Sequence, residues 1–257
     1  PGIREISIKF ANVDPVKEPV PVVPTVHYMM GGIPTTLNGQ VRDGVKQKEV
    51  NGFYAVGECA CVSVHGANRL GSNSLLDLIV FGKAAGQHIL DSSKGKKLKK
   101  LPNDVTKKTI ERLKKIDTKS SLEDPRELGE ELRAVMQKHC GVFRFPQLLN
   151  EGLVKVHELK QRIGNISIKD NSKVFNTART EALELQNLIE VALATMASAK
   201  NREESRGAHS RSDFPKRDDN SWLQHSLYNP KDGSLAYRPV KMKPLSVKSF
   251  PLKERVY

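Results

Sequence analysis

Long apolar runs, aromatic side chains and paired cysteines are scarce or missing in this 257-residue sequence. No stretch of 18 or more apolar residues occurs, so we expect no transmembrane segment in this chain. The three cysteines Cys59, Cys61 and Cys140 give an odd count and lack the spacing of a metal site. We therefore expect free thiols in a reducing compartment.

The start of the sequence lacks the usual signals. It begins at Pro1 without an initiator Met or a signal-like segment. We expect a processed end, the product of a split gene or a piece of a longer chain. A glycine-rich G-x-G-x-x-G turn, the fingerprint of dinucleotide binding, is also absent.

The charge is strongly positive but uneven. The formal net charge is +13, and lysines gather in the run SKGKKLKK at 93–100. Such a run is usually a solvated linker. The interleaved aromatic and basic residues of a single-strand binder are missing, so we expect no nucleic-acid partner. A basic face toward an acidic partner subunit or anionic lipid is the alternative reading.

Residues 1–92 predict a mixed strand, loop and helix unit. Residues 3–13 and 20–28 are predicted to be extended, and Asn38-Gly39 predicts a hairpin turn. A second Asn-Gly precedes a short buried strand at 53–56. After a loop at 61–73, an almost wholly apolar stretch predicts a buried helix. We expect this helix to run to about Leu90, with Asn73 or Ser74 as its N-cap, and its carboxylate Asp77 to bond a loop backbone group.

The rest of the chain changes character. Apolar stripes at helical spacing predict a three- or four-helix bundle at 100–205, in which Asp124-Pro125 begins one helix and Gly164 ends another. The remainder, 206–257, is a proline-rich tail with two strand candidates around Asp232-Gly233.

The loop at 65–74 is the first candidate site. Arg69 lies among small residues just before a helix start, and its planar guanidinium suits a carboxylate. The helix start near Ser74 and Leu75 offers free N–H groups and a positive dipole, which favours negative charge such as the reduced edge of a flavin. From residue type alone, Arg69 is more often a loop-bracing ion pair.

Two further features carry weaker signals. The run GFYAVGE, which ends at Glu58, has the form of a late strand in a flavin-binding domain, although a plain strand and turn is the commoner explanation. His27 precedes a tight glycine turn and is the second site candidate. A lone histidine is more often structural than a ligand or catalyst. The histidines assigned to structural roles are His88, His139, His157, His209 and His225.

Four blocks of sequence carry a resemblance. They are HYMMGGIPT at 27–35, Gly57-Glu58, SVHGANRLGSNSLLD at 63–77 and ESRGAHSRSDFP at 204–215. In this order they resemble the succinate dehydrogenase/fumarate reductase flavoprotein family, and the likeness extends over essentially the whole chain. The implied fold class is α/β plus α: the C-terminal part of a Rossmann-like FAD-binding domain, a helical bundle domain and an extended C-terminal tail.

The resemblance implies a domain division. Residues 1–25 would be the end of a capping domain, and 26–92 the C-terminal part of the FAD-binding domain. Residues 100–205 would form the helical domain, followed by the tail at 206–257. The helical segment and tail would brace the flavin domain and face an iron–sulfur subunit.

The resemblance also implies roles. The family's substrate-binding residues fall on His27 and Arg69, which would hold a dicarboxylate. Its FAD contacts fall on Glu58 and on the helix start at 73–75, that is Asn73, Ser74 and Leu75. A monovalent cation near Met29, Met30 and Glu58 is a weaker implication.

By the same resemblance, catalysis requires parts that lie N-terminal to Pro1: the glycine motif, a flavin-linked histidine and a proton-transferring arginine. No catalytic residue is therefore expected in this half, and the N-terminal half of the flavoprotein must supply them. The implied reaction is oxidation of succinate to fumarate, with electrons passing through FAD and iron–sulfur clusters to quinone.

Several rivals stay open. Fumarate reductase runs the reverse reaction, L-aspartate oxidase shares some motifs, and a non-catalytic scaffold half-subunit of a respiratory complex is the alternative from another class. The implied partners are the iron–sulfur subunit and the membrane-anchor subunits of complex II. The implied place is the matrix side of the mitochondrial inner membrane or, alternatively, the cytoplasmic side of a bacterial membrane.

Overall fold

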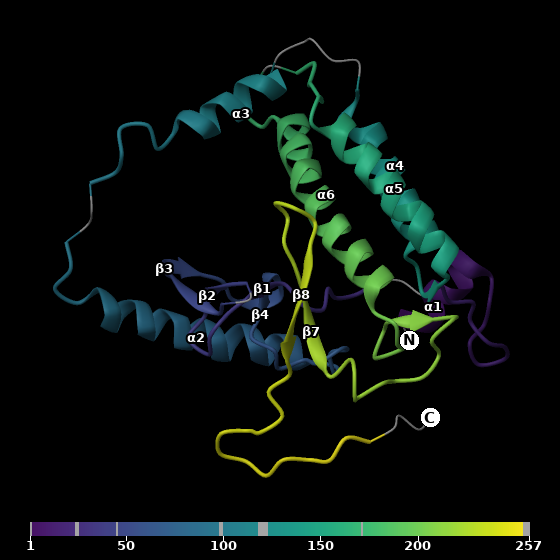
Figure 1. The fold of residues 1–257 in the computed structure, drawn as a ribbon. Coiled ribbons are helices and arrows are strands. Elements are labelled where there is room, and N and C mark those ends of the chain that lie inside the picture. The colour runs from purple at the N-terminus through teal and green to yellow at the C-terminus, as the bar shows by residue number, and fades with distance from the viewer. Residues whose placement is uncertain are drawn as a thin grey trace.

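The computed structural model describes residues 2–23, 26–44, 46–97, 100–117, 123–170 and 172–253. Two groups of elements stand out in Figure 1. Short strands lie along one long helix, α2 (Asn73–Ser93), and three further helices form a bundle beside them. The described residues that follow α2, 94–97 and 100–106, lie away from both groups in the view of Figure 1.

The first residues are helical and not extended. Helix α1 (Gly2–Ile6) continues into a π-helical turn, η1 (Ser7–Ala11), so the strand predicted over 3–13 is wrong. Isoleucines favour strands, but Ile3, Ile6 and Phe10 recur at helical spacing. Further along, 20–23 and 26–28 are irregular, so the second extended segment forms no strand in its described part.

Four short strands make two separate pairs. Strand β1 (Ile33–Pro34) runs parallel to β4 (Ala60–Cys61), and β2 (Gln40–Asp43) runs antiparallel to β3 (Lys48–Tyr54). The Asn38-Gly39 turn forms as predicted, since Gly39 N donates to Thr36 O at 3.0 Å. It joins an isolated Thr35 bridge to β2.

The second Asn-Gly has another role. Asn51 and Gly52 lie inside β3, where Gly52 takes φ +76° and the pairing register shifts. Phe53 is 54% exposed, so the buried strand predicted at 53–56 is wrong in extent and burial. A glycine at a bulge explains why a turn signal occurs within a strand.

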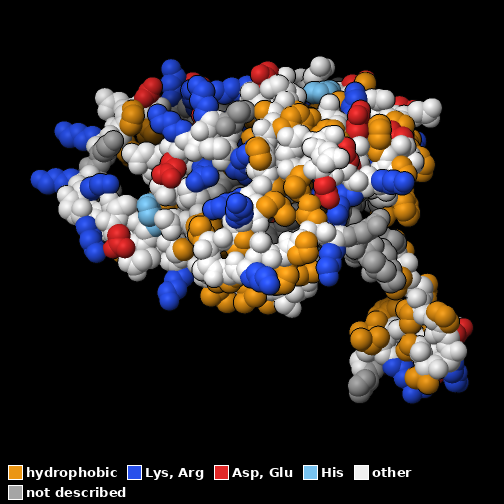
Figure 2. Space-filling model, turned by 60° about the horizontal axis from the view of Figure 1, so that its bottom comes forward, with side chains coloured by type: hydrophobic (Ala, Val, Ile, Leu, Met, Phe, Trp, Pro, Cys, Tyr) orange, Lys and Arg blue, Asp and Glu red, His pale blue; other side chains and the backbone are white. Residues whose placement is uncertain are grey.

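Helix α2 (Asn73–Ser93) confirms the predicted helix but not its burial. Within the described residues, only Asp77 and Ala85 are buried along it. Its large apolar side chains are exposed, among them Leu75, Leu76, Leu78, Ile79, Val80, Ile89 and Leu90. Figure 2 shows hydrophobic groups on the molecular surface among scattered lysines and arginines.

The bundle contains the hydrophobic core. Helix α3 (Lys107–Asp117) adds Ile116 to a core built by α4 (Pro125–His139), α5 (Pro146–Ile163) and α6 (Thr177–Asn201). The stripes predicted from spacing supply most of the buried faces, although Leu188, predicted in the stripe of α6, is 54% exposed. The fully buried side chains include Leu128, Leu149, Val156, Leu159, Ile163, Leu193 and Met196.

Local signals set the ends of these helices. Asp124 caps α4 by accepting a hydrogen bond from Arg126 N at 2.9 Å, and α5 ends at Gly164. Gly152 allows close helix contact, because a Cβ there would lie 2.5 Å from His139 Cβ and 2.7 Å from Met196 Cε. Burying His139 is tolerated, since its Nδ1 pairs with Leu148 O at 3.0 Å.

The C-terminal segment folds back on both groups. Strand β6 (Ser210–Arg211) pairs with β5 (Phe143–Arg144) beside the bundle. The predicted strand candidates form the hairpin β7 (Gln224–Tyr228) and β8 (Leu235–Pro239), which turns at Gly233. From β8, Arg238 donates to Gln47 Oε1 and, at 3.4 Å, to Ser63 Oγ, so the hairpin touches the loop that precedes α2.

Candidate functional site

The loop at 62–72 presents the candidate arginine. It leaves β4 and enters α2 through Ser72, whose φ of +66° lies in the left-handed region. Ser72 is the N-cap and makes no side-chain capping bond, so the predicted caps Asn73 and Ser74 are wrong. Both are the first residues of the helix instead, because the turn at Ser72 redirects the chain before a side-chain cap can form.

Arg69 stacks on an aromatic ring. The centre of its guanidinium lies 4.7 Å from the ring centroid of Tyr28. Its Nη1 donates a long 3.4 Å bond to Leu70 O, and its buried Nε has no hydrogen-bond partner. Across the described ranges no salt bridge joins Arg69 to a carboxylate. The loop-bracing ion pair is therefore not seen there, and the donors are available for an added carboxylate.

Behind Tyr28 lies a buried pair. His65 Nε2 is 2.9 Å from Asp77 Oδ2, and the side chains are 14% and 4% exposed. The His65 ring meets the Tyr28 ring edge-on, with centroids 5.7 Å apart. Asp77 thus bonds a side chain and not the backbone group that was predicted. Burial, followed by the charges of Asp77 and Glu58, raises the pKa of Tyr28.

A hydrogen bond to Glu58 joins the segment after β3 to the segment before the glycine turn. It lies in the short 3-10 turn η2 (Gly57–Cys59), and its Oε1 accepts a hydrogen bond from Met29 N at 3.1 Å. Gly32, at φ +120°, lies so close that a Cβ would be 2.5 Å from Cys59 O. The structure therefore brings Met29 and Glu58 together, with the Glu58 side chain still exposed.

The remaining candidates lie at the surface. His27 is exposed, while Asn73 and Ser74 are half-buried at the start of α2. Leu75 is 63% exposed beside them. Asn73 N donates to Leu70 O and Leu75 N to Ser72 O, whereas Ser74 N has no partner in the hydrogen bonds of the described chain. This helix end can accept a negatively charged or polar ligand edge.

A distant segment supports the arginine loop. At Gly207, which has φ +60°, the chain approaches Ala67 so closely that a Cβ would overlap the Ala67 carbonyl carbon, at 2.6 Å. Gly207 lies between Arg206 and Ala208, in a tight turn where Arg206 N donates to His209 O at 2.8 Å. A glycine is required there by both backbone angle and space.

A buried ion network holds that turn. Glu204 is fully buried, and it pairs with Arg202 at 2.5 Å and with Arg206 at 2.7 Å. Asp218 N donates to its second oxygen at 3.0 Å. Arg206 also reaches Asp219 at 2.8 Å. Because the charge of Glu204 is fully paired and hydrogen-bonded, its burial fixes the geometry of the segment.

His209 completes the support as a structural residue, as predicted. Its Nδ1 accepts from Arg144 at 2.6 Å, and its Nε2 donates to Arg202 O at 3.1 Å. Burial, aided by the charges of Arg144, Arg211 and Arg202, lowers the pKa of His209 to about 4. The ring is therefore neutral at pH 7.

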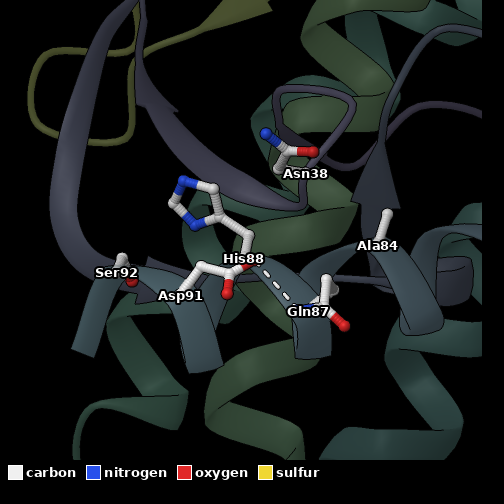
Figure 3. Close-up of a pocket in the computed structure, with 6 residues that line it drawn as sticks. All are labelled: Asn38, Ala84, Gln87, His88, Asp91 and Ser92. Carbon is white, nitrogen blue, oxygen red and sulfur yellow. Dashed lines mark hydrogen bonds between the residues drawn. The ribbon is translucent and has the colours of Figure 1, made fainter. Parts of the chain in front are cut away.

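Two pockets lie near α2. A shallow one of about 530 Å³ is lined by Asn38 and by α2 residues that include His88 and Asp91 (Figure 3). It contains none of the predicted site residues. His88 there bonds Tyr54 Oη at 2.8 Å, which fits its predicted structural role. A small pocket of about 60 Å³ lies against Tyr28 and the His65–Asp77 pair.

Among the described residues no group of three or more His, Cys, Asp or Glu side chains could hold a metal ion. The helices of the described ranges are too short or too polar to cross a membrane. Cys59, Cys61 and Cys140 are free, as expected.

Comparison with known proteins decides the family. A family model described as fumarate reductase flavoprotein C-term matches residues 129–257, and an FAD binding domain model matches residues 1–75. The chain belongs to the succinate dehydrogenase/fumarate reductase flavoprotein family. The resemblance drawn from the four sequence blocks is thereby confirmed.

Relatives carry both names of the family. The chain is 51% identical to the succinate dehydrogenase flavoprotein subunit of Coxiella burnetii, over 99% of this chain and 44% of the relative. It is 44% identical to the mitochondrial subunit of Oryza sativa, over 100% and 42%. It is 41% identical to the fumarate reductase flavoprotein subunit of Proteus vulgaris, again over 100% and 42%. The chain thus spans less than half the length of these relatives.

Solved structures agree on the fold. Quinol fumarate reductase of E. coli matches with a TM-score of 0.82 and 36% identity, over 98% of this chain and 43% of that chain. Mycobacterium smegmatis Sdh1 matches with a TM-score of 0.80 and 29% identity, over 95% and 41%. A mixed helix and sheet unit with a helical C-terminal domain is therefore confirmed.

Parts of this arrangement were not predicted from the sequence. Tyr28, His65 and the loop around Gly207 received no role. His65 lies within the block at 63–77, and a buried carboxylate such as Asp77 needs a partner. They lie twelve positions apart, and the chain between them passes from loop to helix, so no periodicity pairs them.

Proposed function

We propose that this chain is the C-terminal half of an FAD-dependent succinate dehydrogenase flavoprotein, which oxidises succinate to fumarate. The observation that carries the proposal is Arg69. It is stacked on Tyr28, has a buried Nε without a partner, and forms no ion pair with a carboxylate in the described chain. An arginine held in this way is completed by an external carboxylate.

The residues present fit a flavin. Leu75 and Leu76 are 63% and 59% exposed beside the start of α2, and they offer apolar surface to a ring. The unpartnered Ser74 amide can donate to it, and the exposed Glu58 carboxylate can accept from its hydroxyls. FAD, when bound, supplies the redox chemistry by accepting a hydride from the dicarboxylate.

The chain's own residues bind and orient. Arg69 would grip one carboxylate through paired N–H donors, while exposed His27 would donate to the same end of the substrate. The fixed charge of Arg69 also stabilises negative charge that develops during the reaction. Proton removal is assigned to the half of the flavoprotein that this chain does not include.

The exposed apolar face of α2 fits contact with the N-terminal half of the flavoprotein. Its apolar side chains are uncovered in the described residues, and the chain spans 44% of the Coxiella relative. We assign the FAD-binding part that precedes this region in the family as the cover of α2. The proposed domain division stays at 1–25, 26–92, 100–205 and 206–257.

Other assignments follow from the family. We propose an iron–sulfur subunit and membrane-anchor subunits as partners, in respiratory complex II at the mitochondrial inner membrane or a bacterial cytoplasmic membrane. A monovalent cation near Met29, Met30 and Glu58 belongs to the same proposal. Fumarate reduction is the second candidate, since a fumarate reductase subunit is among the relatives.

The test uses the assembled flavoprotein. Arg69→Ala should lower kcat/KM for succinate by about 30-fold or more while flavin content stays unchanged. Removing the guanidinium leaves the bound carboxylate without its charged partner, and such a loss costs about 2–5 kcal/mol. Arg133→Ala on α4, an arginine that is 67% exposed, is the matched control and should leave kcat/KM unchanged. An assembly without flavin, or full turnover in Arg69→Ala, would overturn the proposal.

A further inference from the structure

A continuous series of side-chain contacts connects the start of α2 to the candidate arginine. Asp77 is 5% exposed, in the first turns of the helix. Its Oδ2 lies 2.9 Å from His65 Nε2, and the His65 ring meets Tyr28 at an interplanar angle of 76°. Tyr28 in turn lies under the guanidinium of Arg69 at 4.7 Å. Each step is a direct contact between neighbouring side chains.

Arg69 has few other constraints. Its bond to Leu70 O is long, at 3.4 Å, and its Nε has no partner. A long side chain with weak anchors must otherwise be ordered when the ligand binds, which lowers affinity. The ring of Tyr28 therefore determines where the guanidinium lies before a ligand arrives.

The orientation of that ring is determined in turn by His65. A carboxylate as buried as Asp77 needs a hydrogen-bonded partner, and His65 supplies it. Because this bond fixes one ring nitrogen, the imidazole plane cannot rotate freely, and its edge contact with Tyr28 is held. The bond joins the arginine loop to the rigid helix it precedes.

We propose that Asp77, His65 and Tyr28 are positioning residues for the dicarboxylate: Asp77 and His65 fix the Tyr28 ring, and that ring pre-orients Arg69. None of the three needs to touch the substrate. This proposal rests on the proposed function for its ligand, but the pre-orientation is a property of this chain's own residues and can be measured without turnover.

The first experiment measures the orientation directly in ¹⁵N-labelled flavoprotein. The Nε–H resonance of Arg69, assigned by its loss in Arg69→Lys, should lie upfield because it is near the face of an aromatic ring. It should move downfield in Tyr28→Leu and His65→Gln and stay in place in Tyr28→Phe. His65→Gln keeps a donor for Asp77, which protects folding. An unmoved resonance in Tyr28→Leu would overturn the proposal.

The second experiment measures its effect on binding. In the assembled enzyme, Tyr28→Leu and His65→Gln should raise the KM for succinate and the Kd for malonate by roughly 3- to 30-fold, with kcat little changed. Tyr28→Phe keeps the ring and should match wild type. A loss in Tyr28→Phe equal to that in Tyr28→Leu would mean that the hydroxyl contacts the ligand, and would overturn the proposal.

A double-mutant cycle separates positioning from general damage. If Tyr28 acts through Arg69, Tyr28→Leu should have little further effect on malonate affinity in an Arg69→Lys background. Fully additive losses would contradict the proposal. Failure of the proposed function shows differently: wild-type assembly would then lack flavin or malonate binding, while the Arg69 resonance would still report on the Tyr28 ring.

Discussion

Gly207 offers the sharpest test of how the C-terminal segment supports the arginine loop. It has φ +60°, and an added Cβ would meet the Ala67 carbonyl carbon at 2.6 Å and the Ala67 Cβ at 2.8 Å. Neither atom can move without the Ala67 backbone, because one is a backbone carbon and the other is bonded directly to the Ala67 Cα. Gly207→Ala should therefore suffer twice, from the left-handed backbone and from overlap.

The magnitude follows from these two causes. The left-handed backbone costs alanine about 1 kcal/mol, and overpacking adds about 1–3 kcal/mol. Gly233→Ala is the matched control, because Gly233 has φ +71° and nothing within 4 Å of its Cβ position. It should lose about 1 kcal/mol and no more.

The assay combines thermal unfolding with succinate kinetics in the assembled flavoprotein. At about 2–4 °C per kcal/mol, Tm should fall by roughly 4–16 °C in Gly207→Ala and by about 2–4 °C in Gly233→Ala. Relief of the overlap displaces the loop of Arg69, so the KM for succinate should rise about 10-fold or more in Gly207→Ala alone. Equal Tm and equal KM in the two variants would refute the reasoning.

Two further predictions concern stability. The pKa of His209 is about 4 when folded and near 6.5 when unfolded, so the unfolded state binds more protons between these values, and stability is lost as the pH falls from about 6.5 toward 4. Measured by urea unfolding between pH 7 and 4.5, the free energy of unfolding should depend less steeply on pH in His209→Gln, by up to one proton taken up on unfolding. An unchanged slope would contradict the lowered pKa. Leu149→Ala, at a fully buried position, should cost about 2–5 kcal/mol, whereas Leu188→Ala, which is 54% exposed on α6, should cost less than about 1 kcal/mol by the same measurement.

The helical bundle was predictable because its signals are local and repeated. Asp124-Pro125 marks a start, and the apolar spacing defines the buried faces of α4, α5 and α6. The prediction failed at 3–13, because β-branched residues there favoured a strand over a helical spacing that is only short. It also overstated the burial of α2, since spacing shows which faces are apolar but not whether this chain contains their cover.

The candidate residues of the site could be named from the sequence, whereas their arrangement in space could not. Motifs pointed to Arg69, and resemblance added the rest of the proposed ligand set. The stacking of Arg69 on Tyr28 joins residues 41 positions apart, and the approach of Gly207 to Ala67 joins residues 140 apart. No sequence period encodes such contacts. They arise only when the turn at Gly31-Gly32 and the C-terminal segment take their places.

The long reach of Arg238 has a consequence for how the protein is made. It bonds Ser63, which lies 175 positions earlier in the chain, and Gly207 packs on Ala67, which lies 140 positions earlier. At about 5–20 residues per second, a ribosome needs roughly 7–35 seconds to cover these separations. The arginine loop leaves the exit tunnel long before its braces exist. Its final shape is therefore a late event of translation, and chaperones have that interval in which to shield it.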